Sequence, residues 1–299
     1  MHNKTKVRAL FMALLALFMI AGCSGDKNEK TDETVKKGTT AENEERIVAG
    51  TVVVAEILDK LELDAIAVPE TAKKLPARFK EAQTIGNAME PDMEILKSLN
   101  PTDVLSVSTL EYDLKDKFEQ LKIPVNFLNF QSIDAMQSEI IKLGERYDRT
   151  KQAEELVSNL QKNIDAIQTV TAGKEGPRVL ILLGIPGSYL VATENSYAGD
   201  LVKRAGGVNV MAGQDAEYLS SNTEYLHSSN PDIILRLSHG MPDEVVAMFD
   251  EEFKTNDIWK HFNAVKNGKV YDLEEELFGT TASLQVPTAL GQLVEIFYR

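Results

Sequence analysis

A histidine and a methionine stand where α/β proteins carry ligand-binding residues. His239 lies in IILRLSHGMP (residues 233–242), where an apolar run predicts a buried strand and the glycine and proline predict a loop. Met89 lies in TIGNAMEPDM, just before a predicted helix whose first turn suits Pro91. Because the carboxyl end of a parallel strand and the amino end of the next helix share one rim, both residues fall on ligand-binding rims.

A thioether and an imidazole that face each other could be the two axial ligands of a metal with four equatorial donors already in place. Haem iron is such a metal, and Met/His is a known axial pair. Zinc or manganese would need three or four His, Cys or carboxylate ligands. The spacing alone leaves an ordinary alternative open, in which Met89 is a core residue and His239 a surface or turn residue.

The N-terminus predicts an export signal over residues 1–22. Three basic residues precede twelve apolar residues, 9–20, which are too few for an ordinary membrane span. Cys23 is the only cysteine of the chain, so it cannot form an internal disulfide, and IAGC resembles the lipobox of bacterial lipoproteins. We therefore expect Cys23 to be lipidated; the alternative is a plain signal peptide with an incidental cysteine.

Residues 23–45 predict a flexible tether, since Val35 and Ala41 are the only apolar residues between positions 24 and 45. Acyl chains on Cys23 would hold the protein at the extracytoplasmic face of the cell membrane without spanning it. The folded body is expected to begin near Arg46.

Composition limits the class of protein. The chain has 299 residues, of which 43% are hydrophobic and 26% charged, as in soluble proteins with sizeable cores. The net charge of −14 argues against nucleic acid as a partner, because phosphate recognition needs clustered Lys and Arg.

From Arg46 onward, strand-like and helix-like segments alternate, which predicts an α/β fold with mainly parallel sheets. Residues 145–172 have apolar residues at spacings of three or four and predict one long connecting helix. We expect two Rossmann-like βα lobes, residues 46–144 and 173–299, joined by this helix, with a ligand cleft between them.

An internal repeat supports two lobes. MEILKSLNPTDVL (residues 93–105) and TEYLHSSNPDIIL (residues 223–235) share six of thirteen residues at a constant distance of 130 positions. His227 takes the place of Lys97 in this repeat and His261 lies in a polar segment, so both are interpreted as surface residues rather than metal ligands.

Most of residues 46–299 resembles the lipoprotein receptors of bacterial ABC transporters. The resemblance is to the helical-backbone class that binds iron-siderophore complexes, cobalamin and haem, and within it to the IsdE-type haem receptors. The stretches that carry it are IGNAMEPDMEILKSLNPTDVLSVST, RVLILLGIPGSYLVATENSYAGDLVKRAGGVNV, SSNTEYLHSSNPDIILRLSHGMP and NDIWKHFNAVKNGKVYDLEE.

The resemblance implies that Met89 and His239 are the axial ligands of haem, which is bound as cargo. It implies that Val52 and Val53 line the cleft, and that the loop with Glu70 and Thr71 approaches the porphyrin. Receptors of this type often have smaller or aromatic polar groups in this loop, so Glu70 departs from the family pattern. A carboxylate beside the haem propionates is unfavourable unless it points away or finds a cation.

The resemblance also implies docking on a permease through one acidic residue on each lobe. The candidates are Glu111 on the first lobe and Asp243 or Glu244 on the second. The alternative is that these are ordinary acids at helix starts, where the helix dipole favours negative charge.

The expected function is capture of haem outside the cell and delivery to an ABC permease, by a monomer that is not an enzyme and receives haem from a surface protein. The nearest alternative is a ferric-siderophore receptor of the same fold. A haem-degrading enzyme would need an open axial position on the iron, and a surface adhesion or sensing domain would bind no haem.

Overall fold

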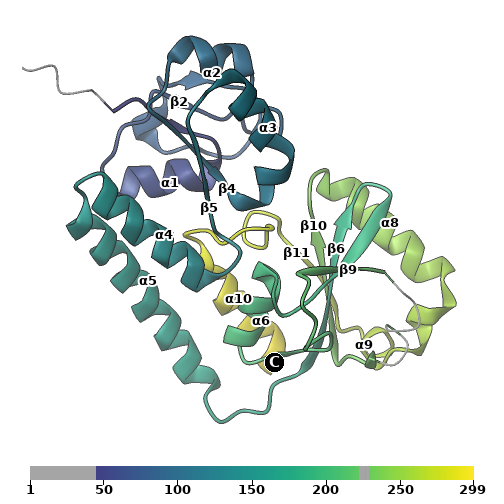
Figure 1. The fold of residues 1–299 in the computed structure, drawn as a ribbon. Coiled ribbons are helices and arrows are strands. Elements are labelled where there is room, and N and C mark those ends of the chain that lie inside the picture. Colours follow the sequence, from purple (N-terminus) through teal and green to yellow (C-terminus); the bar gives the residue numbers. More distant parts are fainter. Residues whose placement is uncertain (1–44, 222–225, 227–228) are drawn as a thin grey trace, which may run out of the picture. The chain divides into compact units, whose positions relative to one another are not determined.

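The computed structural model describes residues 45–221, 226 and 229–299, and these residues form two βα lobes joined by helices (Figure 1). All of them belong to one unit, residues 44–299. The predicted signal peptide and nearly all of the predicted tether, with Cys23, lie outside the described residues.

The first lobe is built on a five-stranded sheet in which every neighbouring pair of strands is parallel, in the order β3-β2-β1-β4-β5. Buried apolar residues fill its central strands, as expected for a parallel sheet covered on both faces. Its elements are β1 (Ile47–Ala49), α1 (Val52–Lys60), β2 (Ala67–Val68), η1 (Ala77–Phe79), β3 (Gln83–Thr84), α2 (Met93–Leu99), β4 (Asp103–Val107), η2 (Ser108–Leu110), α3 (Glu111–Leu121) and β5 (Val125–Leu128).

Two helices lie between the two sheets along the chain, and the second of them falls within the connecting helix that the sequence predicts over residues 145–172. They are α4 (Ile133–Arg146) and α5 (Thr150–Thr171), which pack against each other. α4 ends before Asp148, which has a φ of 55°, and the Arg149 N–H donates to the Gly144 carbonyl at 2.7 Å.

The second lobe contains a six-stranded sheet in the order β11-β10-β6-β7-β9, with β8 paired to β6. β7 and β9 are antiparallel to their neighbours, so this sheet is mixed and the expectation of mainly parallel sheets is met fully only in the first lobe. Its elements are β6 (Arg178–Ile185), β7 (Ser188–Ala192), α6 (Tyr197–Arg204), β8 (Val208–Asn209), β9 (Tyr218–Ser220), β10 (Ile233–Ser238), α8 (Pro242–Thr255), η3 (Asp257–His261), α9 (Asn263–Lys266), β11 (Val270–Leu273) and α10 (Val286–Tyr298).

The internal repeat has the same backbone turn in both lobes. Asn100 and Asn230 precede the repeat strands β4 and β10 and have φ values of 45° and 37°. A proline follows each of them, which disfavours a right-handed helical conformation, and asparagine tolerates the left-handed region. His227 lies outside the described residues.

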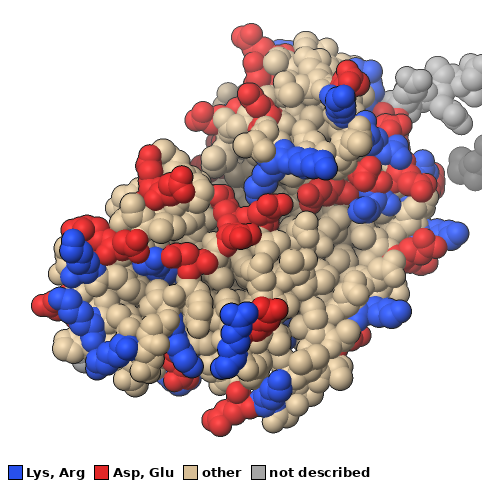
Figure 2. All heavy atoms as spheres, turned by 180° about the vertical axis from the view of Figure 1, so that it is seen from behind, with Lys and Arg blue, Asp and Glu red and all other residues tan. Residues whose placement is uncertain are grey.

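The surface shown in Figure 2 carries basic side chains scattered among acidic ones. On that face they form no continuous basic field of the kind that binds a nucleic-acid backbone.

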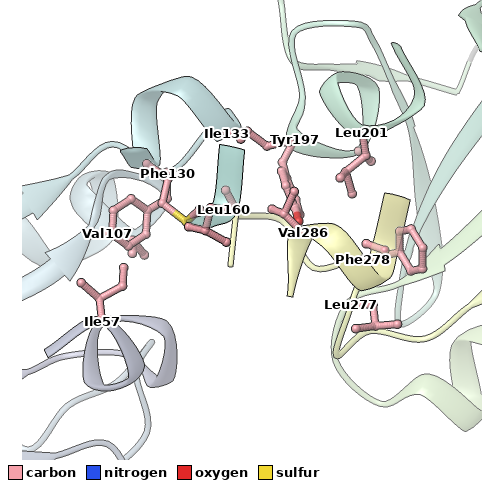
Figure 3. Close-up of a cluster of buried hydrophobic side chains, with 14 of the residues drawn as sticks. Ile57, Val107, Phe130, Ile133, Leu160, Tyr197, Leu201, Leu277, Phe278 and Val286 are labelled. Atoms are coloured by element: carbon pink, nitrogen blue, oxygen red, sulfur yellow. The ribbon is translucent and has the colours of Figure 1, made fainter. Parts of the chain in front are cut away.

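One apolar core runs through both lobes. The same cluster of buried side chains contains Ile57 and Val107 of the first lobe, Leu160 of α5, and Leu201 and Phe278 of the second lobe (Figure 3). α10 packs against both α5 and α6. The lobes are therefore joined by shared packing as well as by the chain.

Candidate functional site

A cavity of about 750 Å³ lies where residues of both lobes meet. This volume is within the range of small-molecule sites, roughly 300–1,000 Å³. Most of the lining residues lie at the carboxyl-terminal ends of strands or in the segments that follow them, and Glu217 and Tyr218 lie at the start of β9. The lining residues are Thr51, Val52, Val53, Glu56, Thr71, Lys73, Lys74, Ala88, Met89, Val107, Ser108, Thr109, Leu110, Gln131, Glu217, Tyr218, His239, Glu275, Glu276, Gly279, Thr280, Thr281, Ser283 and Gln285.

The start of α1 forms one wall of the cavity. Thr51 caps the helix by accepting a hydrogen bond from the Val54 N–H, and Val52 and Val53 occupy the first two helical positions. The N–H groups of these two valines have no acceptor within the helix, so the helix start presents donors and the positive end of its dipole. Gly50 allows the tight turn, since a Cβ there would lie 2.9 Å from the Leu105 carbonyl oxygen.

Met89 lies on the first-lobe side of the cavity, in the loop between β3 and α2. The Asn87 side-chain oxygen accepts hydrogen bonds from the N–H groups of Met89 at 3.0 Å and Glu90 at 2.8 Å. Gly86, with a φ of 79°, pairs with Pro91 in an isolated bridge. The loop is thus fixed by its own hydrogen bonds, while the Met89 residue remains 59% exposed.

His239 lies on the second-lobe side, directly after β10. Its N–H donates to the Gly184 carbonyl at 2.9 Å, which extends the pairing of β10 with β6 by one residue. Its Nδ1 atom lies 3.8 Å from the Glu275 Oε1 atom, and the same oxygen accepts a hydrogen bond from the Gly240 N–H at 3.2 Å. The Glu275 carboxylate thus lies close to the Nδ1 atom of His239 and accepts a hydrogen bond from the backbone of Gly240. This ion pair does not involve the other ring nitrogen of His239, Nε2.

The charged groups of the cavity are four glutamates and two lysines, besides His239. Burial raises the pKa of Glu56, although the charge of Lys73 opposes the shift. Burial also raises the pKa of Glu217, whose carboxylate accepts a hydrogen bond from the Gln131 amide at 2.6 Å. Burial, with help from Glu217, raises the pKa of Tyr218 to about 12, so this phenol stays protonated at neutral pH.

The structure brings most of the predicted binding residues to this one cavity. Val52, Val53, Thr71, Met89 and His239 all line it. Glu70 is exposed and absent from the lining, and its backbone N–H donates to the Gly86 carbonyl.

The predicted permease contacts lie at two helix starts. Glu111 is the first residue of α3 and is paired with Lys115 at 2.9 Å. Asp243 and Glu244 are exposed in the first turn of α8.

Several cavity residues were not predicted from the sequence. Glu275, Glu276, Thr280, Thr281 and Ser283 come from the loop between β11 and α10. β11 runs parallel to β10, so the loop after β11 leaves the sheet at the same edge as His239. An interpretation of VYDL, directly before EEELFGTTASLQ, as a strand could have indicated this loop.

Within the described part of the chain, no group of three or more His, Cys, Asp or Glu side chains is placed to hold a metal ion. None of the helices described between residues 45 and 299 is both long and apolar enough to cross a membrane.

Comparison with known proteins places the chain in a family. Residues 47–277 match the periplasmic binding protein family. The high-affinity heme uptake system protein IsdE of Staphylococcus aureus (strain Newman) is 46% identical over 294 residues, which are 98% of each chain.

Two solved structures share the fold. An ABC transporter substrate-binding protein from Listeria monocytogenes EGD-e has a TM-score of 0.82 and 56% identity, over 85% of this chain and 98% of that one. IsdE of Staphylococcus aureus in complex with heme has a TM-score of 0.83 and 51% identity, over 86% of this chain and 100% of that one. They confirm the predicted α/β fold of two lobes with a cleft, and the chain belongs to the periplasmic binding protein family.

Proposed function

We propose that this chain is a haem receptor, which binds haem in the cavity between its lobes and delivers it to the permease of an ABC transporter. The observation that carries the proposal is that Met89 and His239 line one cavity from opposite lobes. The similarity to IsdE, a protein named for heme uptake and solved with heme bound, supports it.

The donor set fits haem iron. The porphyrin supplies four equatorial nitrogens, so the protein has to supply only two axial ligands, here the Met89 thioether and the His239 imidazole. Histidine ligands usually pair their second ring nitrogen with a carboxylate or carbonyl, which orients the ring. Glu275 beside Nδ1 is placed for this role and leaves Nε2 for the metal.

The walls fit the porphyrin. Val52, Val53, Val107 and Leu110 present apolar surface, and burial of apolar area contributes roughly 25 cal/mol per Å². The propionates need positive partners, and the start of α1 with Lys73 and Lys74 offers them on the first-lobe side.

The charge of the cavity disfavours the alternative cargo. An anionic ferric siderophore would call for arginine, lysine and aromatic side chains around it. Among the described residues, the lining contains four glutamates against two lysines, no arginine, and Tyr218 as its one Phe, Tyr or Trp residue. Haem needs cations only at its propionate edge, so it tolerates the glutamates elsewhere.

No reaction is part of the proposal. Two axial protein ligands leave the iron without an open position for oxygen, which haem degradation requires. The chain belongs to a family of substrate-binding proteins, whose role is binding and delivery.

The setting of the receptor is inferred from the sequence. Cys23 would carry the lipid that holds the protein at the outer face of the cell membrane, with residues 23–45 as the tether. Glu111, Asp243 and Glu244 would contact the permease, and a haem-binding surface protein would supply the cargo to the monomeric receptor.

The test is an absorption titration of the full chain in detergent with haem, with metal-free protoporphyrin, and with haem in the presence of a ferric siderophore. We expect saturable one-to-one binding of haem, weaker binding of the metal-free porphyrin, and no competition by the siderophore. A siderophore that displaces haem, or a haem spectrum that does not change on mixing, would contradict the proposal.

A further inference from the structure

Two large apolar side chains are exposed beside the cavity. Tyr112 is 95% exposed and Met241 is 55% exposed. Tyr112 follows the cavity-lining segment that ends at Leu110, and Met241 lies two residues after His239. Exposed tyrosine and methionine forgo the stabilisation of burial, and aromatic residues and methionine are enriched at protein interfaces.

These two side chains occupy matched places in the two lobes. β4 and β10 are the strands of the internal repeat, and each is followed by a loop and a helix, α3 or α8. Tyr112 is the second residue of α3, and Met241 directly precedes α8. Each lobe therefore presents one apolar side chain at the same helix start, on the rim that carries its cavity residues.

Acidic residues adjoin both side chains. Glu111 and Asp113 flank Tyr112, and Asp243 and Glu244 follow Met241 in the first turn of α8. Asp243 and Glu244 form no ion pair with any lysine or arginine of residues 45–221 and 229–299. An apolar centre with a charged rim is the usual anatomy of a protein interface, and the charge here fits a basic partner.

The backbone at Met241 is unusual for its residue type. Its φ of 45° and ψ of 58° lie in the left-handed region, which glycine and asparagine adopt at the lowest cost. A methionine at this position has an unfavourable backbone conformation, and its side chain is not stabilised by burial. The left-handed backbone and the exposed side chain of Met241 together make it a candidate for contact with another molecule.

We propose that Tyr112 and Met241 are the apolar anchors with which the receptor docks on the permease. The inference rests on the proposed function and adds to it the chemistry of the contact: two apolar sockets, each beside basic residues, on a partner with two like halves. Two matched spots on the lobes suit a two-fold partner, because each half meets an equivalent spot. The partner would also cover the cavity between the spots, from which cargo leaves.

The test measures binding of the haem-loaded full chain to the permease–ATPase complex in nanodiscs. The variants are Tyr112→Ala and Met241→Asn, since asparagine suits the left-handed backbone and removes the apolar side chain. Val170→Ala is the control, because Val170 is an apolar residue 57% exposed on α5, away from the cavity lining. We expect the dissociation constant to rise about tenfold or more in each of the two variants and not in the control, with the haem spectrum unchanged.

Other outcomes assign the residues differently. Unchanged permease binding in both variants would overturn the inference alone, whereas a wild-type protein that does not bind the permease would contradict the proposed function. Weaker haem binding in Met241→Asn with normal docking would place Met241 in the cargo site. Self-association of the chain that depends on Tyr112 would assign the spots to a second copy, and either result would overturn the inference.

Discussion

At the scale of single residues, hydrogen bonds fix the backbone of both proposed ligands, Met89 and His239, while both residues line the cavity. Asn87 fixes the backbone of Met89 through two hydrogen bonds. The hydrogen bond from the His239 N–H to Gly184 fixes the start of the other loop. A methionine and a histidine held in this way can bind a metal without a large cost in ordering their loops.

Glu275 is predicted to strengthen the bond from His239 to haem iron. In Glu275→Gln we expect haem affinity to fall by about tenfold to a hundredfold, the range for partners of metal-ligating histidines. The reduction potential of the bound haem should rise, because a less electron-rich imidazole stabilises the ferric state less. Soret titration and spectroelectrochemistry measure both effects.

Glu276→Gln is the matched control, since Glu276 also lines the cavity and, among the described residues, its side chain forms no ion pair with His239. Equal behaviour of the two variants would show that only the charge of the cavity matters.

Glu56 is predicted to make stability depend on pH. Burial raises its pKa in the folded state above the ordinary 4.5, so the folded state keeps this proton to a higher pH than the unfolded state does. Stability is therefore lost as the pH rises from about 4.5 through the folded pKa. Glu56→Gln should melt at a higher temperature than the wild type at neutral pH, with a smaller difference near pH 4.

Thermal unfolding of both proteins across this pH range is the measurement, with Glu154→Gln, on the exposed face of α5, as the control. A wild type that gains stability relative to Glu56→Gln as the pH rises would refute the assigned direction.

At the scale of elements, the break between α4 and α5 shows what local sequence cannot specify. Residues 132–171 contain no proline and only one glycine, Gly144, so the sequence does not mark where one helix ends and the next begins. In the structure α5 approaches α4 closely at Gly144, since a Cβ on Gly144 would lie 2.4 Å from the Ala153 Cβ. The turn thus depends on packing between two helices, which periodicity along one segment does not reveal.

This close approach predicts opposite effects for two glycine substitutions. Gly144→Ala should destabilise the protein by about 1–3 kcal/mol, because the helices would have to separate. Gly291→Ala in α10 should be neutral or stabilise it by up to about 1 kcal/mol, because alanine favours helix and nothing lies within 4 Å of the new Cβ.

Urea denaturation of the full-length variants compares the free energies of unfolding. Equal stability of Gly144→Ala and the wild type would mean that the helices adjust without cost and that the packing argument is wrong.

At the scale of the whole 44–299 unit, the lobes are tied together. The Ile133 N–H at the start of α4 donates to the Asp200 carboxylate of α6 at 2.9 Å. Arg204 bridges the same Asp200 and Asp134 of α4. With the shared core of Figure 3, these contacts favour a fixed arrangement of the lobes over a free hinge.

We therefore predict that haem binding changes the shape of the protein little. Small-angle X-ray scattering of the full chain in the same detergent should give the same radius of gyration with and without haem. A clear contraction on loading would show that the ties between α4 and α6 open in the free protein.

The general arrangement of the lobes and the placement of two cavity residues could be predicted from the sequence. The repeat fixed which strands are equivalent, so Met89 and His239 could be assigned to corresponding rims. The sequence did not predict that β7 and β9 are antiparallel, or that Glu56 and Glu275 line the cavity. Chain reversals and contacts between distant loops depend on tertiary packing.

The most direct test of the account is the Soret spectrum of the full chain on titration with haem, compared among the wild type, Met89→Ala and His239→Ala. We predict a saturable one-to-one change of the Soret band for the wild type. Each variant should show a different spectrum and weaker haem binding. Three identical titrations would contradict axial ligation by Met89 and His239, and a ferric siderophore would then become the leading cargo.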